Sequence, residues 1–193
     1  MANQKGFNEV FFDNVRAPRS GLLGELNRGW YMATTTLDFE RSSVNSTATA
    51  RRTLEELTSF TKESRLGGQA KANGNLIFDK PSVRLKLADL WLELRIGRYL
   101  AYRVVSFQER GLVPNHEASI VKVFNSEYNQ RLARAGLHIL GLYGQLQPDS
   151  PHARLHGRFE RSYLTTAGST IAAGTSEIQR NIIATRGLGL PRG

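Results

Sequence analysis

Glu40 is a carboxylate placed among apolar residues. It follows Leu37 by three positions and precedes Val44 by four, so all three share one face of a predicted helix. A carboxylate on such a face loses water, which raises its pKa and makes it a better proton acceptor near neutral pH. The residue would also suit the edge of this face, paired with Arg41 or Arg52. The spacing leaves a general base and a structural ion pair both open.

A second candidate site is the segment Ala173-Gly174-Thr175-Ser176-Glu177. Glycine lets a ligand approach the backbone closely, and the helix predicted to follow offers free N–H groups and the positive end of its dipole. Such a segment can bind phosphate. An ordinary capped helix start is the alternative, because Ser176 with Gln179 fits the S-x-x-Q capping box.

Other patterns give weaker signals. Gly141 and Gly144 indicate a tight turn. His152 and His156 lie four residues apart, but the sequence suggests no third ligand, so we predict no metal site. The chain has no cysteine, which excludes disulfides, thiolate metal sites and cysteine nucleophiles.

These residues lie on segments with helical periodicity. Along three long stretches, residues at alternating spacings of three and four define one face of each helix. The predicted faces are Trp30, Ala33, Leu37, Glu40, Val44 and Thr47; Val83, Leu87, Leu90, Leu94, Gly97, Ala101 and Val104; and Ala118, Val121, Asn125, Tyr128, Leu132 and Ala135. A shorter helix is predicted over residues 153–166, and a last one from Thr175 or Ser176 to a point before Gly187. We therefore predict an all-α fold, an antiparallel four-helix bundle in up-down-up-down order.

The first residues follow a different pattern, with a short β-prone stretch that ends at Pro18 and Gly21. Its members are Phe7, Val10, Phe11, Phe12 and Val15. A strand needs a partner strand for its backbone groups, so we expect a remnant of a sheet whose other strands lie upstream. The predicted boundary separates residues 1–28 from a helical bundle over residues 29–193.

The chain has 193 residues, with 26 Lys and Arg against 17 Asp and Glu, a formal charge of +9. The basic residues are dispersed and do not interleave with aromatic residues, which disfavours a nucleic-acid site. The charge fits a solvated basic surface or a site for phosphorylated small molecules. No apolar run is long enough to span a membrane, and the N-terminal residues lack the apolar core of a signal peptide. We expect a cytoplasmic protein without nucleic-acid or membrane partners.

Five stretches carry motifs that are most specific when taken together. They are residues 7–18, 24–30, 37–41, 139–144 and 173–183. In this order they resemble the acyl-CoA dehydrogenases, and the resemblance covers nearly the whole chain, more weakly over residues 64–80. The family combines an N-terminal helical domain, a middle β-domain and a C-terminal four-helix bundle. The resemblance therefore implies that the chain is the end of the β-domain followed by the whole bundle.

The resemblance implies α,β-dehydrogenation of an acyl-CoA thioester with FAD as cofactor. A glutamate removes the α-proton while the β-hydrogen leaves as hydride to the flavin. Most members place this base where the chain has Ala173, but a branch with isovaleryl- and long-chain-type enzymes places it on the first bundle helix, where Glu40 matches. Asp38, Phe39 and Arg41 match neighbours of the thioester. Ala173 and Gly174 would face them.

The resemblance also implies flavin contacts in two groups. Thr175, Ser176 and Glu177 match a segment that contacts the FAD pyrophosphate and ribose.

The second group would bind the flavin of a neighbouring subunit. His138, Gly141 and Leu142 match such a segment, with His138 in place of a glutamine and Leu142 in place of a glycine. Arg65 would substitute for an arginine that grips the pyrophosphate across the subunit boundary, although the family's following aromatic residue is absent.

Two functions follow as alternatives. The first is the C-terminal part of a flavin-dependent acyl-CoA dehydrogenase with Glu40 as base, inactive as an isolated fragment. It would assemble through its bundle and use an electron-transferring flavoprotein or a similar acceptor. The second is a non-catalytic acyl-CoA-binding or structural subunit of a heteromeric dehydrogenase, which the altered flavin motifs favour.

Overall fold

The computed structural model describes residues 8–40, 44–65 and 75–192, and it is predominantly helical. Its α-helices are α1 (Gly29–Glu40), α2 (Val44–Glu63), α3 (Pro81–Glu109), α4 (His116–Leu140), α5 (Arg158–Ser169) and α6 (Ser176–Ile182). In these ranges the only β-pairing is an isolated bridge between Arg65 and Leu76. The predicted all-α class is confirmed.

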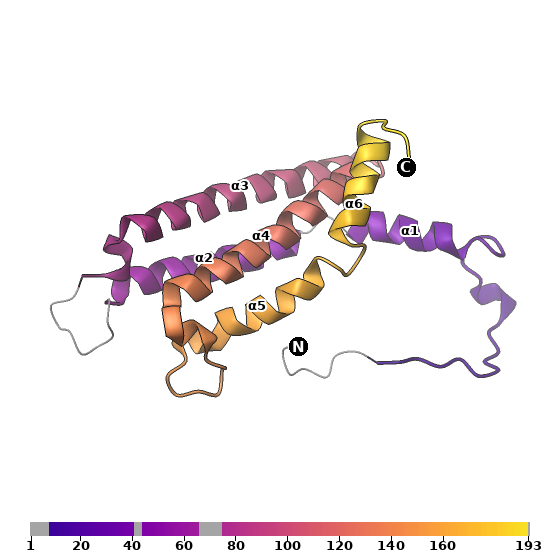
Figure 1. Ribbon diagram of the computed structural model, residues 1–193. Helices are drawn as coiled ribbons and strands as arrows, with labels where there is room; N and C mark the ends of the chain where they lie inside the picture. The colour runs from indigo at the N-terminus through magenta and orange to yellow at the C-terminus, as the bar shows by residue number, and fades with distance from the viewer. Residues whose placement is uncertain (1–7, 41–43, 66–74, 193) are drawn as a thin grey trace.

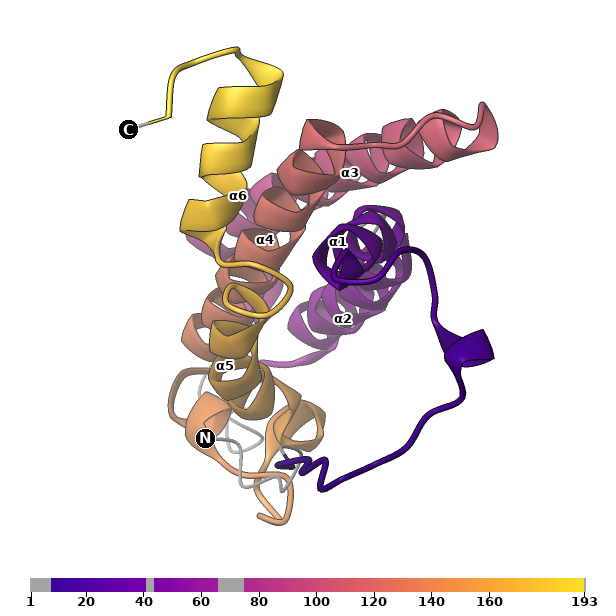
Figure 2. The same ribbon diagram turned by 90° about the vertical axis from the view of Figure 1, so that its right-hand side faces the viewer.

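Helices α2, α3, α4 and α5 lie alongside one another, each running opposite to the one before it (Figure 1). Helix α4 packs against α2, α3, α5 and α6, so it is the central helix of the fold. Helix α6 crosses the N-terminal half of α4, and α1 extends beyond the end of α2 (Figures 1 and 2). Among the described residues, no helix is long and apolar enough to cross a membrane.

The predicted core faces of α3 and α4 are the ones that the fold buries. All seven predicted positions on α3 are buried, and so are all six on α4. The two helices approach closely at Gly97 of α3, where a Cβ atom would collide with the side chain of Asn125 on α4. Phe159 of α5 covers Gly136 of α4 in the same way.

The predicted face of the first helix is buried only in part. Trp30 is 75% exposed and Ala33 is also exposed, whereas Thr47 is buried. The reason is that α1 extends past the neighbours that cover α2, so no described element packs over its first turns (Figure 1). Residues 41–43, between α1 and α2, lie outside the described residues, as do the side chains of residues 37–40 and 44.

The strand expected over residues 7–15 is absent from residues 8–15, which the structure describes as an exposed arm. Phe11 and Phe12 are each 82% exposed on it. A strand requires a hydrogen-bonding neighbour, and the described chain supplies none. The arm ends in a 3₁₀ turn at Arg19–Gly21.

Two further helix ends differ from expectation. The helix predicted to begin at Ala153 begins at Arg158, because Leu155 and His156 have left-handed backbone angles that interrupt the preceding 3₁₀ turn, Arg154–Gly157. After Ile182, the last helix continues as a wider π-helical turn, Ile183–Gly187.

Candidate functional site

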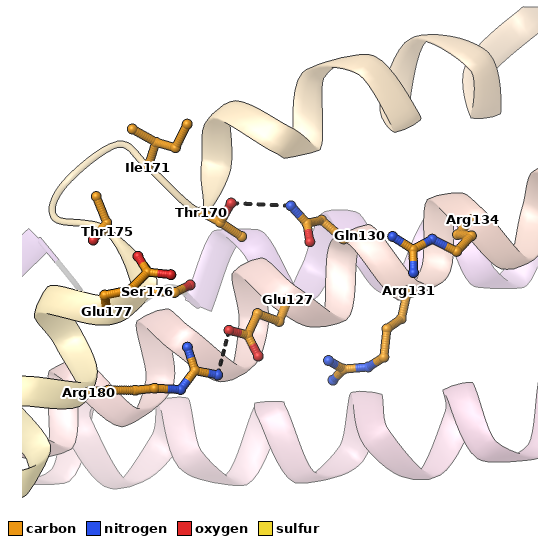
Figure 3. A pocket seen from close by; sticks show the side chains of 10 residues that line it. All are labelled: Glu127, Gln130, Arg131, Arg134, Thr170, Ile171, Thr175, Ser176, Glu177 and Arg180. Carbon is orange, nitrogen blue, oxygen red and sulfur yellow. Dashed lines mark hydrogen bonds and ion pairs between the residues drawn. The ribbon is translucent and has the colours of Figure 1, made fainter.

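A polar cavity of about 400 Å³ lies where α4 meets the α5–α6 loop and the start of α6 (Figure 3). Its walls contain three arginines, two glutamates and several hydroxyl or amide groups. The lining residues are Glu127, Gln130, Arg131, Arg134, Thr170, Ile171, Thr175, Ser176, Glu177 and Arg180. The cavity thus includes three of the residues that the sequence assigns to flavin binding.

The loop that forms one wall has an unusual backbone. Ala173 and Gly174 both have positive φ, +55° and +93°. The Gln179 side chain is completely buried beneath the loop, and its Nε2 donates to the Ala173 carbonyl over 3.1 Å. A Cβ atom on Gly174 would collide with that side chain. Gln179 therefore fixes the loop from below and requires glycine at position 174.

Thr175, rather than Ser176, caps helix α6. Its backbone is extended, and its Oγ1 accepts a hydrogen bond from the Ile178 N–H over 3.3 Å. The predicted Ser176–Gln179 capping box is wrong, because Ser176 is already the first helical residue and Gln179 binds the Ala173 carbonyl instead. The Ser176 Oγ is buried without a hydrogen-bond partner among the described residues.

Glu177 accepts a hydrogen bond from one backbone donor of this helix start. Its exposed carboxylate accepts from its own N–H and from the Thr175 hydroxyl, and these bonds, in that order, lower its pKa below the usual value. Arg180 and Lys122 lower it further by their charge. Because the Ser176 and Gln179 N–H groups bond to the carbonyls of Thr170 and Thr175, a phosphate here would meet side-chain donors first.

The three arginines differ in their pairing. The Arg180 Nη2 donates to Glu127 over 2.7 Å, and the Arg131 Nε donates to Glu93 over 2.6 Å. Arg134 is exposed and has no side-chain partner among the described residues. It is the arginine of this cavity whose full hydrogen-bonding capacity is available to an anion.

The second group of predicted flavin contacts lies at the other end of the bundle. Leu142, in the turn Gly141–Gln145, is 83% exposed, and His138 is exposed one turn before it. Arg65 follows the C-terminal end of α2 at the same end (Figure 1). Along α4, His138 lies eleven residues, about 16 Å of helix, beyond Glu127, which pairs with Arg180 of α6 at the cavity, although it is only four residues beyond Arg134 at the cavity's near edge. The fold keeps the two groups apart within one chain.

Glu40 is the last residue of α1, and Asp38 and Phe39 precede it in the same helix. The side chains of these three residues and the whole of Arg41 lie outside the described residues. The end of α1 lies at the same end of the molecule as the α5–α6 loop with Ala173 and Gly174 (Figures 1 and 2).

The sequence interpretation missed a second cavity of about 360 Å³ between α2, α4 and α5. Its lining combines apolar side chains with hydroxyl groups from α2 and α5 and amide groups from α2 and α4. The lining residues are Asn45, Ser46, Thr49, Ala50, Thr53, Asn129, Leu132, Ala133, Phe159, Ser162 and Thr166. The sequence held a signal for this cavity, because Asn45, Thr49 and Thr53 are spaced four residues apart and so share one face of a helix. In the first cavity, Arg131 and Arg134 are three residues apart, which likewise places them on one face of a helix.

The family model for the acyl-CoA dehydrogenase C-terminal domain matches residues 27–188, and the chain belongs to this family. Among curated relatives, the chain is 31% identical to acyl-CoA dehydrogenase FadE26 of Mycobacterium tuberculosis over 187 residues, 95% of this chain and 45% of that protein. It is 27% identical to subunit CarC of the caffeyl-CoA reductase–Etf complex of Acetobacterium woodii, over 92% of this chain and 44% of that protein.

Among solved structures, the ChsE4–ChsE5 complex from Mycobacterium tuberculosis superimposes with a TM-score of 0.81 and 31% identity. The match covers 95% of this chain and 46% of that one. The chain thus spans less than half the length of the relatives that it matches.

Proposed function

We propose that this chain is the C-terminal part of a flavin-dependent acyl-CoA dehydrogenase, and that the whole protein carries out α,β-dehydrogenation of an acyl-CoA thioester. Residues 1–28 would be the end of its β-domain and residues 29–193 its helical bundle. Membership of the family supports the class of reaction. The location in the cytoplasm stays a prediction from the sequence.

The separation of the two flavin-contact groups is the observation that carries the proposal. Thr175, Ser176 and Glu177 line the cavity at one end of the bundle, while Arg65 and the 138–142 segment lie at the other (Figure 1). We infer that one bound FAD does not contact both groups of the same chain, because they lie toward opposite ends of the bundle. A flavin held between two subunits would use one group from each, which agrees with the subunit-bridging roles that the family motifs imply.

The residues at the cavity fit the phosphates of FAD. Arg134 offers an unpaired guanidinium group that can bind phosphate through two N–H donors. The buried Ser176 Oγ has no partner among the described residues and supplies a further polar group. When bound, FAD would supply the hydride acceptor of the reaction.

The remaining chemistry belongs to side chains of this chain. We assign the α-proton to the carboxylate of Glu40, which ends α1 at the same end of the molecule as the α5–α6 loop. Ala173 has no proton-accepting group, so the loop would position substrate without competing for the proton. Asp38, Phe39, Arg41 and Gly174 would surround the thioester, and closing this region to water would strengthen Glu40 as a base.

A non-catalytic acyl-CoA-binding or structural subunit is the second candidate. His138 and Leu142 replace a glutamine and a glycine in the flavin segment, and a structural relative is a complex of two named chains, ChsE4 and ChsE5. An electron-transferring flavoprotein as acceptor is supported by the relative CarC, named as a subunit of an Etf complex.

Flavin content and flavin reduction of the full-length protein, purified with any subunit that accompanies it, test the proposal. We expect bound FAD whose absorbance bleaches when an acyl-CoA is added without oxygen. Acyl-CoA binding without bound flavin would favour the second candidate. A protein that binds neither flavin nor acyl-CoA would contradict both.

A further inference from the structure

Arg131 lines the polar cavity, but its ion-pair partner lies outside that cavity. The Arg131 Nε donates to Glu93 Oε2 of α3 over 2.6 Å, and Glu93 is not one of the lining residues. The guanidinium carbon of Arg131 lies 5.8 Å from the centre of the Phe124 ring. Among the described residues, the Arg131 Nη1 and Nη2 groups donate to no partner. Glu93 therefore binds one N–H of this arginine and leaves both Nη groups available.

The Glu93–Arg131 pair is partly buried beside the core. Leu94, next to Glu93 on α3, and Tyr128, one turn before Arg131 on α4, are both buried. Burial first, and then the charge of Glu93, raise the pKa of the Tyr128 hydroxyl well above its usual value, while Arg131 lowers it. The hydroxyl therefore stays neutral beside the pair. The two charged side chains are 27% and 37% exposed, so water and salt weaken their attraction less than at an open surface.

The pairing of Arg131 differs from that of the other two arginines of the cavity. Arg134 has no side-chain partner among the described residues, so binding an anion would first have to order it. Arg180 is paired with Glu127, which itself lines the cavity and would repel an anion there. Figure 3 shows Arg131 pointing away from Arg134, on the side of the cavity where Arg180 and Glu127 meet. Arg131 is thus oriented in advance by a carboxylate that lies outside the cavity.

We propose that Glu93 is a positioning residue for the cofactor, which acts through Arg131 by orienting its two Nη groups towards the pyrophosphate oxygens of FAD. The proposal rests on the proposed function, because it takes the cavity to hold the phosphates of FAD. It adds Arg131 to the phosphate contacts and identifies a residue that affects FAD without touching it. Neither residue belongs to the two groups of flavin contacts that the sequence predicts.

Titration of the apoprotein with FAD, followed by flavin fluorescence, measures the effect in the full-length protein with any subunit that accompanies it. Glu93→Ala should weaken FAD binding by about three- to tenfold, since the long Arg131 side chain must then be ordered on binding. Glu93→Gln keeps an acceptor oxygen for the Arg131 Nε and should retain most of the affinity. Glu56→Ala is the matched control, because Glu56 pairs with Arg158 between α2 and α5 and neither lines the cavity. It should leave FAD affinity unchanged.

A double-mutant cycle with Arg131→Gln tests whether Glu93 acts through Arg131. In the Arg131→Gln background, Glu93→Ala should no longer weaken FAD binding. A merely structural role of Glu93 would lower the free energy of unfolding but would give no such coupling in FAD affinity. Additive losses of affinity in the cycle would overturn the proposal, and so would a Glu93→Gln variant that binds FAD as weakly as Glu93→Ala.

The same titration separates this proposal from the proposed function. Wild-type FAD binding that is unchanged in Glu93→Ala would overturn the role of Glu93 and leave the proposed function standing. A full-length wild-type protein that takes up no FAD would overturn both.

Discussion

Ala173 and Gly174 stand side by side in the left-handed backbone region, and only one of them is glycine. A left-handed conformation costs an ordinary L-residue about 1–2 kcal/mol, so the loop holds Ala173 against its preference. The buried side chain of Gln179 maintains this arrangement through its bond to the Ala173 carbonyl. The strain lies where we propose that substrate and flavin meet.

Gly174→Ala should destabilise the chain by about 1–3 kcal/mol, because it adds backbone strain and a collision with Gln179. Chemical denaturation measures the loss. Gly168→Ala is the matched control, since its Cβ would meet nothing within 4 Å and alanine favours the α5 helix. A Gly174→Ala variant as stable as the control would show that the loop does not have the described conformation.

Glu177 predicts a pH dependence with a definite sign. Its pKa is lowered on folding, chiefly by the bond to its own N–H, so its stabilisation is present above the usual value of 4.5. This stabilisation disappears as the pH falls below 4.5 through the folded-state pKa. Urea unfolding of wild type and Glu177→Gln should differ at pH 7 and converge at low pH.

The control for this pH dependence is Glu109→Gln at the exposed C-terminal end of α3, where losing a negative charge favours the helix dipole. That variant should be equal to wild type in stability or slightly more stable at pH 7. A Glu177→Gln difference that stays constant from pH 7 to pH 3 would exclude the hydrogen bonds assigned to the Glu177 carboxylate.

At the scale of the elements, the contact between α3 and α4 depends on Gly97 lying against Asn125. Gly97→Ala should cost about 1–3 kcal/mol through overpacking, because its Cβ would also come within 3.3 Å of Phe124. Asn125→Ala removes the side chain nearest to the added Cβ atom, so the double variant should regain part of the stability lost in Gly97→Ala. Denaturant unfolding of all four members of this double-mutant cycle checks the coupling, and additive losses would contradict it.

The long helices could be predicted from the sequence because each buries a continuous line of side chains. Every predicted core position of α3 and α4 is buried, including the polar Asn125. The Thr175 cap was harder to predict, because Ser176 and Thr175 are both good capping residues. The choice between them depends on where Gln179 points.

Other elements could not be predicted because their neighbours are not part of the described chain. The β-prone residues of the arm lack a partner strand, and Trp30 of α1 lacks a surface to cover it. Local propensity indicates which secondary structure a segment can adopt, and packing against neighbouring elements determines which one it adopts. The apolar residues Leu85, Leu92, Ile96 and Tyr99 of α3 are exposed, and their spacing was also present in the sequence. The prediction used the longer and more regular core face of the same helix.

At the scale of the whole molecule, the sequence motifs predict two groups of flavin contacts, and the fold adds where each group lies. The two groups lie at opposite ends because α4 and α5 are antiparallel. The segment 138–142 is at the C-terminal end of α4, and α5 then leads back along α4 to Thr175, Ser176 and Glu177. Arg134 could not be recognised from a motif, because its significance lies in lining the same cavity as the start of α6 without a side-chain partner among the described residues.

These 193 residues alone should show no acyl-CoA dehydrogenase activity, since the chain spans less than half the length of its relatives and its two predicted groups of flavin contacts lie at opposite ends. The assay contains FAD, a series of acyl-CoA thioesters and an artificial electron acceptor. The full-length protein in the same assay is the control. Turnover by the isolated chain would show that the missing parts are dispensable for the reaction.

Stopped-flow reduction of bound flavin by acyl-CoA in the full-length Glu40→Gln variant tests the central claim most directly. Losing a general base should slow the bleaching of flavin absorbance by about 10²–10⁴-fold while FAD stays bound. Glu63→Gln, at the exposed end of α2, is the matched control and should bleach at the wild-type rate. Bleaching of the Glu40→Gln variant at the wild-type rate would contradict the assignment of Glu40 as the base.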